Sequence, residues 1–395
     1  MRKRRIITSL CLTVLLVSMI AGYISLPDRV ILYKDRSWKR DDITNLSINN
    51  EYIETLHDAI VPRKAGDYEA SLSLFGIPYK NVTVRVLEDE KVIVGGSSIG
   101  IRLYADSLIV IAVGRVNSKG KSPAEEAGIK EGDVIVSLNG EKVGSPEEFS
   151  KRIEEINGEV TLGIQTGDGV KNVTLTPEVS EYDNVKRIGL WVRDSTAGVG
   201  TLTYMNPKDM SYGALGHGVS DSDTGVKFTV KEGSVEECAI GEIKKGEKGV
   251  PGEMKGVFLS NAKVLGNITK NEKEGIFGNL THMPQGEMVE TGHKSEIKKG
   301  VAHIRTSLDG KTVEEYEIEI LKVSKNTKNP SKGLVIQVTD ERLIEKTGGI
   351  VQGMSGSPIL QDGKLIGAVT HVLVNDPTRG YGIFIENMLE ASEGN

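Results

Sequence analysis

The chain has 395 residues and a formal net charge of −6; 38% of its residues are hydrophobic and only 5% are aromatic. This length allows two or three domains with ordinary hydrophobic cores. The net negative charge disfavours a nucleic-acid partner, and no basic stripe follows the N-terminal segment. The two cysteines, Cys11 and Cys238, lie far apart in the sequence, which excludes a disulfide within one domain and a cysteine-based metal site. We expect neither a metal nor another cofactor.

The N-terminus, residues 1–27, predicts a membrane anchor. Four cations at positions 2–5 precede a largely apolar stretch, Ile6–Leu26, which Pro27 ends. A helix over this stretch would reach roughly 30 Å, the thickness of a bilayer core. The cations favour a cytoplasmic N-terminus, so the rest of the chain is expected on the other side. The small residues of a signal-peptide cleavage site are missing, which favours an uncleaved anchor.

Two short regions follow the anchor. Residues 28–68 are polar and mixed, and we interpret them as a linker with one short helix. Residues 69–95 contain two alternating runs, SLSL and VTVRV, on either side of Gly76 and Pro78. Alternation with period two is typical of half-buried strands, so this small β region is expected to form a hairpin.

Residues 96–178 resemble a PDZ domain. The run A-G-I-x-x-G-D-x-I, residues 127–135, comes in the right order with the amphipathic segment SPEEFSKRIEEI, which starts at Ser145. In that family, a loop with an apolar-Gly-apolar run binds the carboxyl terminus of a peptide through backbone N–H groups, and the peptide then adds as a strand. By this resemblance the peptide-binding loop consists of Ser98, Ile99, Gly100 and Ile101. The alternative is a domain that only packs against its neighbour.

The segment 181–395 is rich in glycine, valine and isoleucine. Short strand-like runs such as VEEYEIEIL and KLIGAVTHVLV alternate with turn signals such as Asp309-Gly310 and Asp362-Gly363. Many short strands at this spacing favour a β-barrel or a pair of barrels. The chain as a whole is therefore predicted to be mainly β, with a PDZ domain ahead of a barrel domain.

The sequence GMSGSP, residues 353–358, raises the question of a serine nucleophile. A nucleophile elbow would need glycine two positions after the serine, followed by a helix, and neither is present. The segment instead resembles the G-x-S-G-x-P motif of chymotrypsin-like proteases. In that arrangement Ser355 is the nucleophile, and the N–H groups of Gly353 and Ser355 form an oxyanion hole. Ser357 is the weaker candidate, because Pro358 constrains its backbone.

A serine hydroxyl needs a base, and several histidines are available. His217 lies between two glycines, which suits close access to a substrate backbone, and it is the preferred base, with His282 as the alternative. His303 lies on an expected strand and is interpreted as structural. His371 follows the serine on an apolar strand, and we interpret it as a wall of the specificity pocket.

The orienting acid is harder to assign. Asp221 and Asp223 follow His217 so closely that they are expected to serve turns, and Asp309 lies in a hairpin turn. Asp340 ends an expected strand 15 residues before Ser355 and is the best of several candidates.

Taken together, these segments closely resemble the stage IV sporulation protein B peptidase family. The likeness rests on the anchor, the PDZ-like region and the motifs RIGLWVRDSTAGVGTLTY, GALGHGVSD and GGIVQGMSGSP. It implies a serine endopeptidase whose trypsin-like catalytic domain is a chymotrypsin-like β-barrel. It places the triad on His217, Asp340 and Ser355. In most chymotrypsin-like relatives the acid lies much farther from the serine, so Asp340 departs from the general pattern.

The resemblance also implies a biological role. The family acts as a signalling protease between the two membranes around the forespore, and the implied substrate is the membrane-bound regulator that holds back processing of the sigma-K precursor. Two alternatives remain open. One is a membrane-anchored PDZ scaffold without catalysis. The other is an envelope quality-control protease similar to the high-temperature-requirement family, in which the PDZ domain follows the protease domain.

Overall fold

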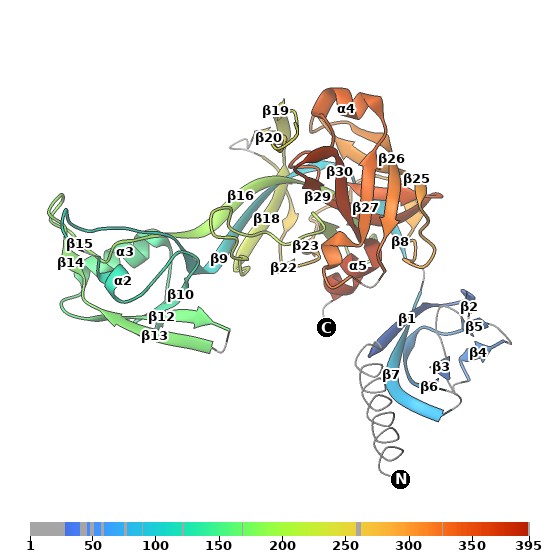
Figure 1. Ribbon diagram of the computed structural model, residues 1–395, viewed down its shortest axis with the longest axis horizontal. Helices are drawn as coiled ribbons and strands as arrows, with labels where there is room; N and C mark the ends of the chain where they lie inside the picture. Colours follow the sequence, from blue (N-terminus) through green and yellow to red (C-terminus); the bar gives the residue numbers. More distant parts are fainter. Residues whose placement is uncertain are drawn as a thin grey trace, which may run out of the picture. The chain divides into compact units, whose positions relative to one another are not determined.

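A computed structural model describes residues 28–39, 46–47, 51–56, 59–74, 77–88, 90–120, 122–167, 169–257, 262–325 and 327–393 (Figure 1). The chain divides into two compact units, residues 1–90 and residues 91–395. The predicted membrane anchor, residues 1–27, lies outside the described residues. None of the described helices is both long and apolar enough to cross a membrane.

The first unit is a small β structure. A four-stranded sheet has the order β1-β7-β6-β3, and a three-stranded sheet has the order β2-β5-β4. The strands are β1 (Arg29–Tyr33), β2 (Trp38–Lys39), β3 (Leu46–Ser47), β4 (Ile53–Thr55), β5 (Ala59–Pro62), β6 (Gly66–Leu74) and β7 (Ile77–Leu87). The predicted hairpin is confirmed, because β6 and β7 pair antiparallel. The linker predicted over residues 28–68 is wrong: strands from this segment form part of both sheets, and Leu32 and Ile60 are buried in their core.

Two long antiparallel strands, β9 (Ser98–Val113) and β16 (Leu190–Met205), are the central strands of the second unit. They pair with each other from Ser98–Thr201 to Val113–Leu190, with two irregularities on the way. The PDZ-like elements lie between them in sequence (Figure 1). These elements are α2 (Pro123–Glu126), β10 (Val134–Leu138), β11 (Glu141–Lys142), α3 (Pro146–Glu155), β12 (Val160–Thr166), β13 (Gly169–Leu175), β14 (Glu178–Val179) and β15 (Lys186–Arg187).

Helix α3 forms where the sequence predicted a helix start. The Ser145 hydroxyl accepts a hydrogen bond from the Glu148 N–H, and Pro146 occupies the first turn, where its missing N–H costs nothing. Phe149 and Ile153, one turn apart, are buried against the PDZ-like core. The polar face of the helix stays in solvent.

The N-terminal half of β9 and the C-terminal half of β16 belong to a second group of strands. They pair there with β8 (Lys91–Val94), β17 (Ser211–Ala214) and β18 (Glu232–Glu237). The rest of the group is β21 (Val264–Asn267), β22 (Lys270–Glu272), β23 (Gly275–Asn279) and β24 (Met288–Glu290), with the separate hairpin β19 (Ala239–Lys244) and β20 (Glu253–Val257). A buried apolar cluster that includes Ile99, Leu103 and Tyr212 holds this group together.

The C-terminal part of the chain is a closed six-stranded barrel in the order β25-β26-β27-β30-β29-β28. Its strands are β25 (Gly300–Ser307), β26 (Val313–Val323), β27 (Leu334–Val338), β28 (Pro358–Gln361), β29 (Lys364–Leu373) and β30 (Asp376–Phe384). The short helix η2 (Pro330–Lys332), α4 (Glu341–Thr347) and α5 (Ile385–Glu393) complete it. The predicted β-barrel is confirmed.

The structure changes the predicted peptide-binding loop. Ser98, Ile99, Gly100 and Ile101 lie within β9; all four pair with β16 on one side, and Ile99, Gly100 and Ile101 also pair with β18 on the other. A segment paired on both edges has no free edge for an added strand, so these residues do not form a peptide-binding loop. They belong to the strand group that also carries β17, and the PDZ-like elements are therefore inserted into that group. The barrel-containing part of the chain begins near β8 and not at residue 181.

Candidate active site

Ser355, His217 and His371 line one cavity of about 460 Å³. Ser355 comes from the loop before β28, His217 from the loop after β17, and His371 from β29. The cavity wall also includes Thr196–Val199 of β16 and the loop segment Ile350–Gly353. The structure thus brings together the serine and the preferred histidine from segments that lie far apart in sequence.

The Ser355 loop needs glycines for steric reasons. Gly353 has a φ of 99° and Gly356 a φ of 94°, a region that other residues rarely adopt. A side chain on Gly356 would also place its Cβ 2.1 Å from the Thr201 carbonyl oxygen. These constraints explain why small residues surround the serine.

Two buried threonines, which the sequence analysis did not single out, hold the same loop. The Thr201 hydroxyl donates to the Gly353 carbonyl at 2.9 Å, and the Thr203 hydroxyl donates to the Gly356 carbonyl at 2.7 Å. The Thr201 N–H donates to the Ser355 carbonyl at 2.9 Å. The signal for them was present in TLTY, where two threonines alternate on one face of an otherwise apolar strand.

The two predicted oxyanion donors are free to receive a substrate oxygen. In the part of the chain that the structure describes, no acceptor takes the N–H of Gly353 or of Ser355, and both residues line the cavity. Neighbouring N–H groups are occupied: Met354 donates to Val351 and Gly356 donates to Val369. Two free donors beside a serine can stabilise a developing oxyanion.

The Ser355 hydroxyl donates to the Thr370 carbonyl at 2.7 Å, and no hydrogen bond joins it to His217 among the described residues. Ser357, in contrast, is fully buried, and its hydroxyl has no partner among the described residues. Ser357 does not line the cavity. Of the two serines, only Ser355 is therefore accessible to a substrate.

His217 is held by its own loop. Its Nδ1 lies 2.9 Å from the Gly218 carbonyl, an arrangement that favours the proton on Nδ1 and leaves Nε2 as an acceptor. Burial lowers the pKa of His217 below its ordinary value, while the Gly218 carbonyl raises it by a smaller amount. The buried Asn271 side chain fixes the loop by bonding the N–H and the carbonyl of Val219 and the carbonyl of Phe228. Nothing in the sequence pattern singled out Asn271.

His371 lies beside His217, with 4.8 Å between the ring centroids. Burial, as the largest cause, and the nearby His217 and Lys332 together lower the pKa of His371 to about 4. Both imidazoles are therefore neutral near pH 7. His371 lines the cavity, and its role as a wall of the specificity pocket stays a prediction.

The other histidines in the described part of the chain lie elsewhere. His282 is exposed and contacts the Thr281 hydroxyl, and His303 lies within β25. His293 is buried, with its Nε2 2.7 Å from a Glu386 carboxylate oxygen. None of the three lines the Ser355 cavity.

Asp340 is not brought to His217. Its side chain is the N-cap of α4, where it accepts from the Arg342 N–H at 2.9 Å, and it forms an ion pair with the Arg342 guanidinium at 2.7 Å. The Arg342 hydrogen bond is the main cause that lowers the pKa of Asp340. Asp340 does not line the cavity. Its assignment as the orienting acid therefore rests on the family resemblance.

Asp221 and Asp223 are turn residues, as predicted. One oxygen of the buried Asp221 carboxylate accepts from the N–H groups of Asp223 and Thr224, and the other bonds Arg193 of β16. Asp223 also pairs with Arg193, at 2.8 Å. The two acids thus anchor the loop after His217 to β16.

Several curated proteins resemble short parts of the chain. A probable periplasmic serine endoprotease DegP-like from Bartonella henselae is 42% identical over 69 residues, which is 17% of this chain and 14% of the relative. Serine protease HTRA1 of Xenopus laevis is 39% identical over 61 residues, or 15% of this chain and 13% of the relative. The regulator of sigma-W protease RasP of Bacillus subtilis is 33% identical over 78 residues, or 20% and 18%. The chain spans less than a fifth of the length of each of these relatives.

Solved structures give weaker likenesses. The active form of the Rv3671c protease from M. tuberculosis matches with 12% identity and a TM-score of 0.32, covering 50% of this chain and 75% of that one. The inactive form of the Rv3671c protease matches with a TM-score of 0.30, covering 50% of this chain and 85% of that one.

Two family models match the chain. A model described as a PDZ domain matches residues 116–166, the segment inserted between β9 and β16. A model described as SpoIVB peptidase S55 matches residues 184–389, more than half of the chain, and this segment contains the whole cavity around Ser355 except Ile101 of β9. The chain therefore belongs to the SpoIVB peptidase S55 family and contains a PDZ domain.

Proposed function

We propose that this chain is a serine endopeptidase, and that it acts as a membrane-anchored signalling protease of endospore formation in the space between the forespore and mother-cell membranes. Its proposed substrate is the membrane-bound regulator that restrains processing of the sigma-K precursor. Family membership supports the proposal, as does the anchor that the sequence predicts ahead of residue 28. The observation that carries the chemistry is the single cavity that contains Ser355, His217 and two free N–H donors.

In the proposed reaction, Ser355 Oγ attacks the carbonyl carbon of the substrate peptide bond, and its proton passes to Nε2 of His217. The N–H groups of Gly353 and Ser355 receive the oxygen that becomes negative. His217 then gives the proton to the leaving amine, and a water molecule hydrolyses the acyl-enzyme by the same route. Asp340 is the acid that the resemblance assigns to this unit.

The structure describes a resting arrangement of these residues. Ser355 donates to Thr370, His217 contacts Gly218, and Asp340 pairs with Arg342, so each is satisfied by another partner. Catalytic hydrogen bonds often form only when a substrate is bound. A signalling protease that must stay inactive until its substrate arrives benefits from such an arrangement.

The test of the signalling role is direct. The full chain is mixed with the extracytoplasmic parts of membrane proteins made during sporulation, and the fragments are identified by mass spectrometry. The proposal expects one dominant cleavage in the regulator of sigma-K processing. Unselective cleavage of unfolded proteins in the same mixture would favour the quality-control alternative.

A fluorophosphonate probe separates the protease from a catalytically inactive scaffold. Because the probe reacts only with activated serines, we expect one labelled peptide that contains Ser355. An unlabelled but folded chain would favour the scaffold.

We also expect the acid limb of the pH profile, where activity falls as the pH is lowered, to lie below pH 6.5. His217 must be neutral to act as a base, and its burial lowers its pKa below the ordinary histidine value of about 6.5, so protonation starts only at more acid pH. The measurement is kcat/KM for a small ester from alkaline pH downward. The variant His371→Gln is the control, because His371 titrates at about 4 and its removal should leave the limb in place. An acid limb above pH 6.5 would contradict His217 as the base in this environment.

A further inference from the structure

No carboxylate in the described part of the chain forms an ion pair with His217, so another group must orient its ring. The hydrogen-bond partner of Nδ1 is the Gly218 carbonyl, at 2.9 Å. A carbonyl can only accept, so this contact requires a proton on Nδ1 and leaves Nε2 free to take the proton of Ser355. The position of the Gly218 carbonyl therefore decides whether His217 can act as a base.

The Gly218 carbonyl belongs to a peptide unit that a buried side chain holds from the opposite side. The N–H of this peptide unit comes from Val219, and it donates to the Asn271 side-chain oxygen at 2.7 Å. The Asn271 amide nitrogen donates to the Val219 carbonyl at 2.8 Å and to the Phe228 carbonyl at 2.9 Å. Asn271 is 5% exposed, and its side chain thus uses both of its N–H groups and its oxygen.

These hydrogen bonds form one chain in which each group accepts on one side and donates on the other. The ring N–H donates to the peptide carbonyl, the peptide N–H donates to the asparagine oxygen, and the asparagine N–H groups donate to two further carbonyls. Hydrogen bonds in series polarise one another, and the effect is larger in a buried site than in water. The chain can therefore stabilise the positive charge that the ring acquires when it takes the proton of the serine.

Position 271 requires an amide rather than a carboxylate. An aspartate could still accept from the Val219 N–H, but its second oxygen would face the carbonyl oxygens of Val219 and Phe228 and could donate to neither. A buried carboxylate beside two acceptors is costly. A neutral side chain that accepts once and donates twice is what this site needs.

Asn271 lies on a strand that runs close to the loop of the base. It is the middle residue of β22 and pairs with Ile276 of β23. A side chain on Gly218 would place its Cβ 2.7 Å from the Glu272 carbonyl oxygen, so glycine is needed for β22 to come so close. The 218–219 peptide unit is thus held directly against β22.

The chain just before His217 is fixed by a strained turn. Leu215 has a φ of 69°, a rare value for a bulky residue, and the Gly216 N–H donates to the Ala214 carbonyl at 2.9 Å. This turn packs against the serine loop: a Cβ on Gly356 would lie 2.5 Å from the Leu215 nitrogen. Such strain persists where the surrounding structure enforces it, and it is frequent at functional sites. His217 therefore follows a fixed turn that also contacts the serine loop.

We propose that Asn271 is a positioning residue for the base: through the 218–219 peptide unit it holds His217 in the tautomer with the proton on Nδ1. Asn271 does not line the catalytic cavity and acts through the Gly218 carbonyl. This inference rests on the proposed function, because it assigns a role within the same catalytic unit. It adds to the role of Asp340, which the family resemblance supplies.

The test reads the tautomer directly. The full chain is labelled with a heavy nitrogen isotope in its histidines and examined by NMR at alkaline pH, and the variant His217→Gln identifies the signals of His217. We expect the parent chain to show a proton on Nδ1. In Asn271→Ala the 218–219 peptide unit loses its support, so we expect a mixture of the two tautomers. An unchanged signal in a folded Asn271→Ala chain would overturn the proposal.

A kinetic measurement links the tautomer to catalysis. With a slow ester, Asn271→Ala should acylate at least about tenfold more slowly than the parent chain, because a displaced catalytic group loses rate. The binding of the ester should change little, since Asn271 does not line the cavity. Weaker binding with an unchanged rate constant for acylation would contradict a role that acts through the base.

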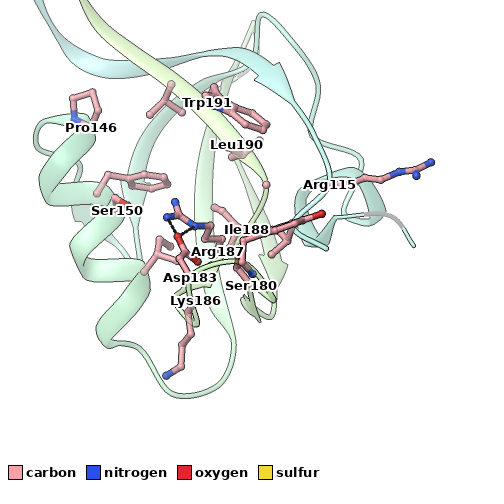
Figure 2. A pocket seen from close by; sticks show the side chains of 16 residues that line it. Arg115, Pro146, Ser150, Ser180, Asp183, Lys186, Arg187, Ile188, Leu190 and Trp191 are labelled. Carbon is pink, nitrogen blue, oxygen red and sulfur yellow. Dashed lines mark hydrogen bonds and ion pairs between the residues drawn. The ribbon is translucent and has the colours of Figure 1, made fainter. Parts of the chain in front are cut away.

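Asn117→Ala is the matched control. The Asn117 side chain also bridges a loop, because it accepts from the Glu181 N–H at 2.8 Å and donates to the Val179 carbonyl at 3.3 Å. This loop lies in the PDZ part of the chain, where Ser180 lines a separate cavity of about 410 Å³ (Figure 2). Asn117→Ala should lower the free energy of unfolding without changing the His217 tautomer or the rate of acylation. If both variants slowed acylation equally, the effect would be one of general stability and the proposal would fail.

Gly218→Ala keeps the test decisive if Asn271→Ala does not fold. The added Cβ would lie 2.7 Å from the Glu272 carbonyl oxygen, so it must push the peptide unit away from β22 while Asn271 itself is unchanged. We expect the same mixture of tautomers and slower acylation. The control is Gly167→Ala, in a turn of the PDZ part with open space around the added Cβ. A parent-like tautomer in Gly218→Ala would contradict the proposal.

The two readouts separate this inference from the proposed function. If the parent chain fails to hydrolyse the ester, the proposed function is wrong, while the NMR signals still decide whether Asn271 sets the tautomer. If the parent chain hydrolyses the ester and Asn271→Ala keeps both the Nδ1 proton and the full rate, only the inference about Asn271 is wrong.

Discussion

Ser355→Ala should abolish peptide-bond cleavage and leave the protein folded. The Ser355 hydroxyl is the accessible oxygen nucleophile beside the two free donors, and without it no acyl-enzyme can form. Removal of the nucleophile from such a unit costs on the order of 10⁴- to 10⁶-fold in turnover. The measurement is the rate of cleavage of a protein substrate together with the free energy of unfolding. Stability should change by about 1 kcal/mol, because one hydrogen bond to the Thr370 carbonyl is lost.

Ser357→Ala is the matched control for this experiment. It removes the same hydroxyl two positions away, from a side chain that is fully buried and has no hydrogen-bond partner among the described residues. Loss of a buried hydroxyl without a partner should leave both turnover and stability nearly unchanged. If Ser357→Ala were inactive and Ser355→Ala active, the nucleophile would have to be moved by two residues.

Local sequence patterns predicted the conformation of the Ser355 loop. The run GMSGSP predicts a tight loop that exposes one serine, and the structure shows why: Gly356 has no room for a side chain, and Pro358 begins a buried strand. The N-cap Ser145 and the apolar spacing of α3 were predicted equally well, because both depend on residues a few positions apart. These features depend on residues that are close in sequence, so local sequence patterns are enough to predict them.

Features that depend on distant partners were missed. Gly100, between two isoleucines, has the composition of a carboxylate-binding loop, but its partners in β16 and β18, Val199 and Glu236, lie 99 and 136 positions away in sequence. The run Ile188-Gly189-Leu190 has the same composition but lines a cavity in the PDZ part of the chain. Only the pairing distinguishes the two runs, and pairing is not visible in a single sequence. The insertion of the PDZ domain between β9 and β16 was missed for the same reason.

The polar composition of residues 28–68 also misled the prediction. The short strand β4 exposes two of its three residues, so a linker and a small sheet have similar compositions there, although β5 is buried along its length. Their core depends on residues as far apart as Leu32 and Val84.

Asp340→Asn should lower turnover by about 10⁴-fold if the family's assignment of the acid holds, and that is the result we expect. In such a unit the carboxylate fixes the tautomer of the histidine and stabilises its protonated form, and an amide can do neither. The structure makes this substitution unusually informative, because the resting position of Asp340 is the N-cap of α4.

Asparagine caps a helix about as well as aspartate, so the N-terminus of α4 should remain intact. The lost ion pair involves Arg342, whose side chain is 58% exposed, and such surface pairs contribute about 0–1 kcal/mol. The free energy of unfolding should therefore change by no more than about 1 kcal/mol. A large loss of turnover in a protein of normal stability cannot be explained by damage to the helix.

The matched control is Asp223→Asn, which also removes one carboxylate charge from an aspartate paired with an arginine, here Arg193 beside the loop of His217. It should retain most activity. All variants are compared by single-turnover acylation with a slow ester at the same alkaline pH. Near-normal acylation by Asp340→Asn would mean that Asp340 serves only as the N-cap of α4. The Gly218 carbonyl, 2.9 Å from Nδ1, would then be the group that orients His217, and catalysis would proceed without a carboxylate at the imidazole.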